Sequence, residues 1–261
     1  MIAPIIGLWL DDFVLRARAF TSEQFQGAFM AKSLSEMLED STLKCRTLDA
    51  PLGMRLSAFA DDVRLLSPEF ADIVDRMVNR LKQAGAGDAA PAVGAVFPNF
   101  VLPDQDGHLV GLTQLLDRGP VVVAFHRGHW CPYCRINAEA IARIQPMVNA
   151  SGGTIVAITP ELERFSAALK ADAAARFPVL SDIDNAFALE TNLAIMISGE
   201  KRDAMTQAGW DIALFHGNDS WMLPIPATFV VGTDQRVRAR FVDPDYRKRM
   251  DIDSILSALR Q

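Results

Sequence analysis

Two short apolar runs constrain the fold of this chain more than any other feature. Residues 121–125 read Val-Val-Val-Ala-Phe and residues 155–158 read Ile-Val-Ala-Ile. Runs without alternating polar positions are typical of strands that are buried on both faces of a sheet. A helical pattern over residues 132–149 separates them, and Pro146 is expected to kink or end that helix. Strand, helix and strand in this order predict an α/β core.

Later segments extend this pattern. A further helix is predicted over residues 161–175, followed by a short apolar segment at 177–180. Residues 227–231 predict another strand, and residues 236–241 alternate Arg with Val, Ala and Phe, which indicates a half-buried antiparallel strand. An amphipathic helix over residues 251–260 closes the chain. We therefore expect a mixed central sheet flanked by helices.

The first third of the chain predicts helices instead of strands. Thr21 and Gln24 fit a capping box at one helix start. A clearer helix is predicted with Ser67 as its cap and Pro68 at its first position, and it ends at Gly85. Its apolar stripe consists of Phe70, Ile73, Val74, Met77, Val78 and Leu81. Such a stripe needs a partner surface, so we regard a homodimer as possible.

A segment rich in Ala, Gly and Pro over residues 84–98 indicates a linker between two units. We expect a helical N-terminal segment over residues 1–90 and an α/β domain over residues 91–261. No repeat or low-complexity tract interrupts either unit.

Charge and hydropathy restrict the surroundings in which the protein works. The net charge of −6 and the lack of a long basic run argue against a nucleic-acid partner. The first ten residues are apolar but too short to cross a membrane, and Asp11 and Asp12 follow without a basic start or a cleavage site. We therefore expect a cytoplasmic protein with no membrane partner.

The stretch Cys131-Pro132-Tyr133-Cys134 is the predicted active site. It follows the first buried strand and begins a helix, where unpaired amides and the helix dipole stabilise a thiolate and lower its pKa. Cys131 is therefore the predicted nucleophile. Cys134 lies one turn further along and could attack a mixed disulfide or a sulfenic acid on Cys131, which would give a reversible redox cycle.

Neighbouring residues are candidates for supporting this thiolate. Arg127, His129 and Arg135 could stabilise its charge, and Trp130 could shield it from water. Pro132 belongs to the same motif. Solvated surface positions for the charged residues and plain packing for Trp130 are the alternatives to these roles.

Other uses of the cysteines fit less well. A zinc site would need four ligands, and the Cys pair with His126 and His129 offers poor spacing and no second Cys pair. We expect neither a metal nor another cofactor. Cys45 stands alone in the helical segment and is interpreted as a small buried hydrophobe.

Several stretches resemble the alkyl hydroperoxide reductase and thiol-specific antioxidant family, the peroxiredoxin-like branch of the thioredoxin superfamily. Residues 121–135 resemble its active-site segment, residues 94–104 its opening segment, residues 177–182 its central strand and turn, and residues 221–231 its late strand. The resemblance covers residues 93–260. It implies a thioredoxin-like α/β sandwich. The N-terminal helical segment lies outside the resemblance, and we expect it to pack on this sandwich or on a partner subunit.

The sequence departs from true peroxiredoxins around the nucleophile. With Cys131 in the place of the peroxidatic cysteine, Ala124 and Gly128 occupy the family's Pro and Thr positions. The peroxide-polarising Arg of the family would fall near Pro226. Pro226 instead resembles the cis-proline that lies beside the Cys pair of thioredoxins.

The resemblance implies a thiol-dependent antioxidant oxidoreductase. Cys131 would reduce a hydroperoxide, Cys134 would resolve the product to a disulfide, and an external dithiol such as a thioredoxin or glutaredoxin would restore both. The alternative is a thioredoxin-like reductase of protein disulfides without significant peroxidase activity. A non-enzymatic module that binds zinc or a partner is the third hypothesis.

Overall fold

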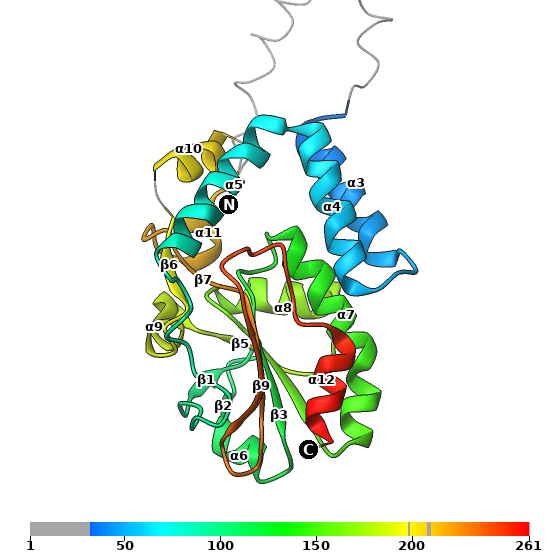
Figure 1. Cartoon of the computed structure of the whole chain (residues 1–261), viewed down its shortest axis with the longest axis vertical. Coiled ribbons are helices and arrows are strands. Elements are labelled where there is room, and N and C mark those ends of the chain that lie inside the picture. Colours follow the sequence, from blue (N-terminus) through cyan, green and yellow to red (C-terminus); the bar gives the residue numbers. More distant parts are fainter. Residues whose placement is uncertain (1–31, 198, 208–209, 261) are drawn as a thin grey trace, which may run out of the picture.

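A computed structural model describes residues 32–197, 199–207 and 210–260 (Figure 1). The capping box predicted at Thr21 and Gln24 lies outside these residues. No helix in the described ranges is long and apolar enough to cross a membrane.

The central sheet has five strands in the order β5-β4-β3-β8-β9. Strand β3 pairs in parallel with β4, and β4 pairs in parallel with β5, whereas β8 and β9 continue the sheet antiparallel to their neighbours. The predicted mixed sheet is thus present. Its strands are β3 (Val121–Phe125), β4 (Thr154–Thr159), β5 (Val179–Ser181), β8 (Ala227–Val231) and β9 (Val237–Val242).

Strand β3 is the centre of the core because both of its faces are buried. Val122 and Ala124 pack among residues of the helices on one face, and Val123 and Phe125 pack among an aromatic group on the other. This arrangement explains why the run has no polar position. The first face is covered by α7 (Pro132–Ala150), α8 (Glu163–Asp172) and α12 (Ile252–Leu259), and the second by α6 (Leu112–Leu116) and α9 (Ala186–Glu190).

Helix α7 continues through Pro146 to Ala150, so Pro146 does not end the helix, and the kink at this position stays a prediction. The remaining strands form two small antiparallel pairs at the edges of the core. They are β1 (Val101–Pro103) with β2 (Leu109–Gly111), and β6 (Ala194–Met196) with β7 (Met222–Pro224).

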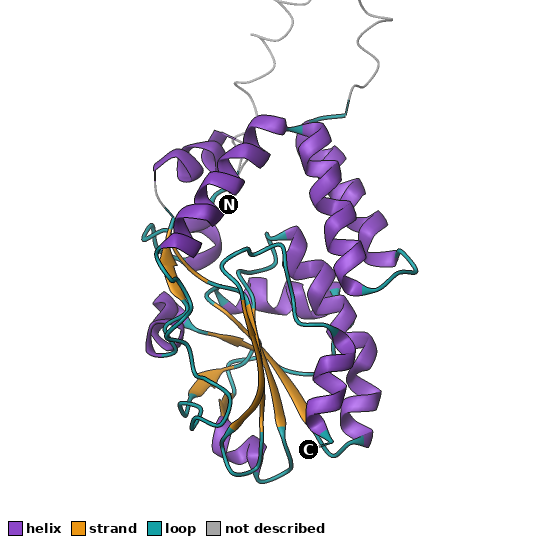
Figure 2. Ribbon diagram, in the orientation of Figure 1, coloured by secondary structure: helices purple, strands orange, loops and turns teal. Residues whose placement is uncertain are grey.

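A helical layer lies at one end of the sheet (Figure 2). It consists of α3 (Leu34–Thr47), α4 (Leu52–Leu66) and α5 (Pro68–Gln83), joined by the later helices α10 (Gly199–Gln207) and α11 (Ile212–His216). Ser33 and Glu36 form a capping box at the start of α3. Helix α5 begins at Pro68 as predicted, although Ser67 makes no side-chain capping bond.

The apolar stripe of α5 is covered by the chain itself. Ile73, Val74, Met77 and Val78 are buried, and Val74 packs in one cluster with Leu223 and residues of the Cys pair. The exposed stripe that would favour a homodimer is therefore absent from the described residues of this helix. The physical reason is that α10, from a distant part of the sequence, packs against α5.

Helix α4 connects the helical layer to the helix that carries the Cys pair. The rings of Phe59 and Tyr133 meet edge to face with centroids 4.9 Å apart. Buried Arg55 donates to the carbonyl oxygens of Cys45 and Arg46 and forms an ion pair with Glu139 on α7. The start of α7 is thus held by side chains from α4.

Replacing Phe59 tests how much this contact stabilises the fold. Phe59 is 1% exposed, so Phe59→Ala leaves a cavity beside Tyr133 and should lower the free energy of unfolding by about 3 kcal/mol. Urea denaturation measures the change. Met54→Ala, at an exposed position of the same helix, should change it by less than about 0.5 kcal/mol. Equal effects of the two substitutions would show that the Phe59 contact does not hold the layers together.

Candidate active site

The Cys pair lies where β3 leads into α7. Cys131 is the N-cap residue of α7, and Pro132 occupies the first turn, where a missing N–H is tolerated. The amides of Cys134 and Arg135 donate to the carbonyl oxygen of Cys131 at 3.0 and 3.1 Å. Both cysteines are reduced and buried, with 1% of Cys131 and 0% of Cys134 exposed. The predicted strand, turn and helix start are therefore confirmed.

The turn before the Cys pair is shaped around a buried carboxyl group. Gly128 has φ +132°, and a Cβ atom there would lie 2.4 Å from the carboxyl carbon of Glu161, so only glycine fits. Glu161 accepts a hydrogen bond from the His129 amide at 2.7 Å. Burial raises the pKa of Glu161 to about 8, and the charge of Cys134 adds to this effect. No motif around Glu161 indicates this role.

The groups around Cys134 favour a negative charge on its sulfur. The Arg127 amide and Arg249 Nη2 each donate to Cys134 Sγ at 3.3 Å. Burial opposes ionisation, but the hydrogen bond from Cys131 and the charge of Arg249 hold the pKa of Cys134 well below its usual value. The two side chains are hydrogen-bonded to each other, and the donors around Cys134 favour the negative charge on that sulfur.

The predicted lowering of the pKa at Cys131 is wrong in its direction. Burial raises the pKa of the Cys131 thiol well above its ordinary value, and the neighbouring Cys134 sulfur raises it further. The helix start favours a negative charge, as expected, but Arg249 favours that charge on Cys134 instead of Cys131. Arg249 lies 115 residues beyond Cys134, so motif spacing could not reveal the contact.

Buried His126 lies behind the pair, with its Nε2 atom 3.0 Å from the Asn137 side-chain amide. Burial lowers the pKa of His126 to about 4, which leaves its ring neutral. Within the described part of the chain, the Cys pair and the two histidines do not form a cluster of three or more metal ligands. The zinc arrangement considered above thus gains no geometric support.

The structure separates the candidate supporting residues into two groups. Arg127 is buried, and its guanidinium carbon lies 4.8 Å from the Trp130 ring and 4.2 Å from the Tyr246 ring. Arg127, Trp130 and Pro132 line the same cavity as Cys131. These three residues therefore share the surroundings of the first thiol.

Arg135 and His129 are engaged elsewhere. Arg135 donates to both carboxylate oxygens of Glu39 at 2.6 and 2.8 Å and to Asp172 at 2.7 Å. His129 Nε2 lies 3.6 Å from Asp172, and burial and the charge of Arg135 lower the pKa of His129. These residues tie α7 to α3 and α8, and neither lines the cavity beside Cys131.

Pro226 also differs from expectation. The described residues contain no cis peptide bond, so the predicted cis form of Pro226 is wrong. Pro226 is buried just before β8 and does not line the cavity that contains Cys131. The resemblance to a thioredoxin proline therefore does not extend to its geometry.

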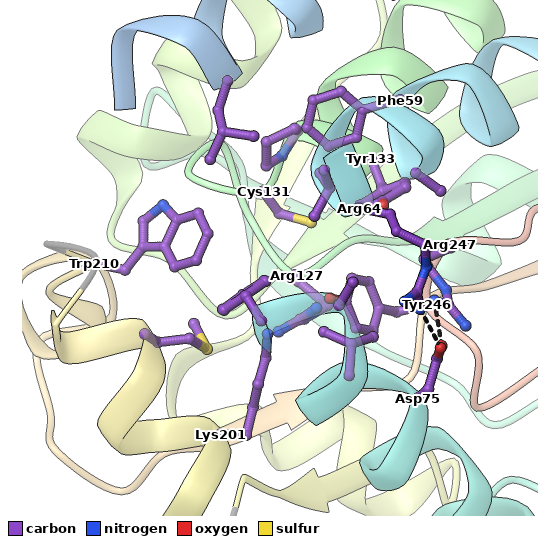
Figure 3. A pocket seen from close by; sticks show the side chains of 18 of the residues that line it. Phe59, Arg64, Asp75, Arg127, Cys131, Tyr133, Lys201, Trp210, Tyr246 and Arg247 are labelled. Atoms are coloured by element: carbon purple, nitrogen blue, oxygen red, sulfur yellow. Dashed lines mark hydrogen bonds and ion pairs between the residues drawn. The ribbon is translucent and has the colours of Figure 1, made fainter. Parts of the chain in front are cut away.

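A cavity of about 240 Å³ opens beside Cys131, between α4, α5, α10 and the start of α7 (Figure 3). Cys131 lines it, whereas Cys134 does not. Sequence reasoning missed most of its wall because the residues come from segments that are distant along the chain. Among those missed are Phe59, Phe70, Lys201, Trp210, Tyr246 and Arg247.

The chain is similar to known proteins in both sequence and structure. The model of the AhpC/TSA family matches residues 93–240. The structure is similar to that of peroxidoxin BcpB from Mycobacterium tuberculosis, with 22% identity, a TM-score of 0.52 and coverage of 65% of this chain and 97% of the other. It is also similar to peroxiredoxin 6 of Arenicola marina in its C45S form, with 15% identity, a TM-score of 0.50 and coverage of 64% and 71%.

These structural similarities confirm the predicted thioredoxin-like α/β fold. No protein of curated function matches the sequence. The helices α3, α4 and α5 precede the residues that the family model matches. One wall of the cavity therefore comes from a segment outside the matched part.

Replacing Arg249 tests the location of the charge. Arg249→Met removes the cation that contacts Cys134 Sγ, so the pKa of the more acidic thiol should rise by about one pH unit or more. Titration of the ultraviolet absorbance of the thiolate measures this pKa. Arg249→Lys keeps a charge and should give a smaller rise, and Arg118→Met, at an exposed position, should give none. An unchanged pKa in Arg249→Met would contradict the assignment.

Glu161 should make stability depend on pH. Its pKa of about 8 in the folded protein exceeds the ordinary value of 4.5, so the stability that its protonated form contributes is complete below pH 4.5 and is lost as the pH rises to about 8. A pKa that differs by one between the folded and unfolded states corresponds to about 1.4 kcal/mol, so the loss amounts to a few kcal/mol.

Glu161→Gln keeps an acceptor for the His129 amide but does not titrate. Its free energy of unfolding, measured with urea at several pH values, should therefore fall less than that of the unaltered protein between pH 4.5 and about 8. Parallel pH profiles for the two proteins would contradict a raised pKa at Glu161.

Proposed function

The chain belongs to the AhpC/TSA family, and from this premise we propose that it is a thiol peroxidase that reduces small hydroperoxides at Cys131. The observation that carries the proposal is the position of Cys131 in a cavity that the thiolate-forming Cys134 does not reach. One sulfur is thus available to a substrate, and the other is available to exchange a proton and to form a disulfide.

The enclosure of Cys131 favours a small oxidant. Only 1% of the residue is exposed, and the surrounding wall includes α4 and α5. A disulfide on the surface of a folded protein would have to displace these helices to reach the sulfur, whereas a hydroperoxide can enter the cavity. This steric argument favours a peroxidase over the alternative of a protein disulfide reductase.

The first chemical step uses the hydrogen bond between the two sulfurs. Cys131 passes its proton to the Cys134 thiolate and becomes the nucleophile. Its sulfur then attacks the terminal oxygen of the hydroperoxide, and the O–O bond breaks. Cys131 becomes a sulfenic acid, and the alcohol leaves with the proton that Cys134 held. Cys134 is again a thiolate at the end of this step.

The second step closes the disulfide. The Cys134 thiolate attacks the sulfenic sulfur of Cys131, a disulfide forms, the S–O bond breaks, and hydroxide leaves to the solvent. The two thiols have then lost the two electrons that reduced the hydroperoxide. We propose that an external dithiol of the thioredoxin or glutaredoxin kind reduces the disulfide and is itself oxidised to one.

Arg127 is the group best placed to stabilise charge on the leaving oxygen. Its side chain is buried, lines the cavity with Cys131, and has an Nη2 atom without a hydrogen-bond partner among the described residues. A donor fixed in a site of low dielectric stabilises a developing oxyanion strongly. Arg127 would therefore take the role of the family's peroxide-polarising Arg, whose position falls near Pro226 in this chain.

Single-turnover experiments test these roles. With one equivalent of hydroperoxide, Cys134→Ser should form a sulfenic acid on Cys131, more slowly than the unaltered protein because the proton acceptor is lost. Cys131→Ser should consume no hydroperoxide beyond background. Cys45→Ser, at a buried position of α3, serves as the control and should still form the disulfide. Mass spectrometry identifies each product.

Two results would contradict the proposal. Rapid consumption of hydroperoxide by Cys131→Ser would identify Cys134 as the reactive sulfur. Oxidation of the unaltered protein no faster than that of a free thiol would exclude a peroxidase, and rapid reduction of insulin disulfides would then favour the reductase.

A further inference from the structure

Lys201 is a buried cation that the proposed reaction does not use. Lys201 lies on α10, and only 1% of its surface is exposed. It lines the cavity that contains Cys131 (Figure 3). No carboxylate of the described residues lies within ion-pair distance of its Nζ atom. Burial of an unpaired charge is costly. Because Lys201 lines the cavity, a bound ligand could supply the missing partner.

The other cations around the cavity already have partners. Arg64 pairs with Asp72 and Asp75, at 2.8 and 2.5 Å. Arg247 pairs with Asp75 and Asp245, each at 2.7 Å. Among the described residues, the cavity wall is therefore left with the charges of buried Lys201 and Arg127 and with the exposed carboxylate of Asp61.

The sulfur pair does not neutralise Lys201. The negative charge rests on Cys134, whose Sγ atom accepts a hydrogen bond from Arg249. Cys134 does not line the cavity. Lys201 Nζ instead lies 3.3 Å from the centroid of the Phe70 ring. A cation–π contact stabilises a charge less than burial of an unpaired charge costs. Burial and the charge of Arg127 accordingly hold the pKa of Lys201 well below its usual value, whereas a carboxylate bound beside its Nζ atom would favour the charged form.

The rest of the wall is largely apolar. Phe59 and Val74 come from the N-terminal helices, and Met205 and Trp210 come from the later segment that packs against them. A ligand that fits this wall has an apolar body. A ligand that neutralises the charge of Lys201 has an anionic group. A hydroperoxide acid satisfies both requirements.

We propose that the cavity selects organic hydroperoxides that carry a carboxylate, with Lys201 binding the carboxylate while Arg127 and Cys131 face the peroxide. This inference deepens the proposed function and rests on it for the identity of the reacting group. The binding part does not depend on turnover. Lys201 is a specificity-determining residue in this account.

Equilibrium binding to the reduced protein tests the carboxylate site without any reaction. The probes are decanoate and decanol, which share an alkyl chain and differ in charge, and calorimetry measures their affinities. Decanoate should bind at least about tenfold more tightly, which corresponds to about 1.4 kcal/mol. In Lys201→Met the two affinities should become similar. Lys44→Met, an exposed lysine on α3, should keep the difference.

The comparison of probes on the unaltered protein decides the matter even if Lys201→Met does not fold. Equal affinities for decanoate and decanol, or a preference that persists in folded Lys201→Met, would overturn the inference.

A kinetic comparison separates failure of this inference from failure of the proposed function. The unaltered protein should have a higher kcat/KM for a cumene hydroperoxide that carries a carboxylate on its ring than for neutral cumene hydroperoxide, and Lys201→Met should reduce that ratio about tenfold or more. Reduction of both substrates with equal kcat/KM would overturn the selectivity alone. Reduction of neither, together with tight binding of decanoate, would overturn the peroxidase and leave the carboxylate site standing.

Discussion

The hydrogen bond between the thiol of Cys131 and the thiolate of Cys134 determines how the rest of the site is arranged. Arg249 and the Arg127 amide both donate to the Cys134 sulfur, so the negative charge rests on the deeper of the two residues. The shallower sulfur keeps its proton and lines the cavity. In the mechanism that we propose, the resting nucleophile is therefore neutral, and its proton acceptor is one helical turn away.

The helical layer gives this member of the AhpC/TSA family an enclosed site. Helices α4 and α5 precede the residues that match the family, yet their side chains form one wall beside Cys131. The contact of Phe59 with Tyr133 fixes that wall to the active-site helix. Burial of the polar groups around Cys131 strengthens their electrostatic interactions. In the function that we propose, the helical layer therefore limits which substrates reach Cys131.

The local features of this chain could be predicted from its sequence, and the distant contacts could not. The apolar runs at 121–125 and 227–231 are strands because full burial on both faces leaves a direct compositional sign. The start of a helix at the Cys pair is also predictable from local sequence, because the pair follows the buried strand and a short turn. The raised pKa at Cys131 depends on its burial and on the Cys134 sulfur, and the negative charge on Cys134 depends on Arg249. The character of the cavity depends on Lys201. Arg249 and Lys201 reach the site only through the tertiary fold.

The two sulfurs should ionise in a defined order. Nuclear magnetic resonance titration of the reduced protein, with isotope-labelled cysteine assigned at both Cβ atoms, measures each sulfur separately. Cys134 should ionise first, at a pH well below the usual range of a thiol, and Cys131 should remain protonated far above it. Ionisation of Cys131 before Cys134 would contradict this order.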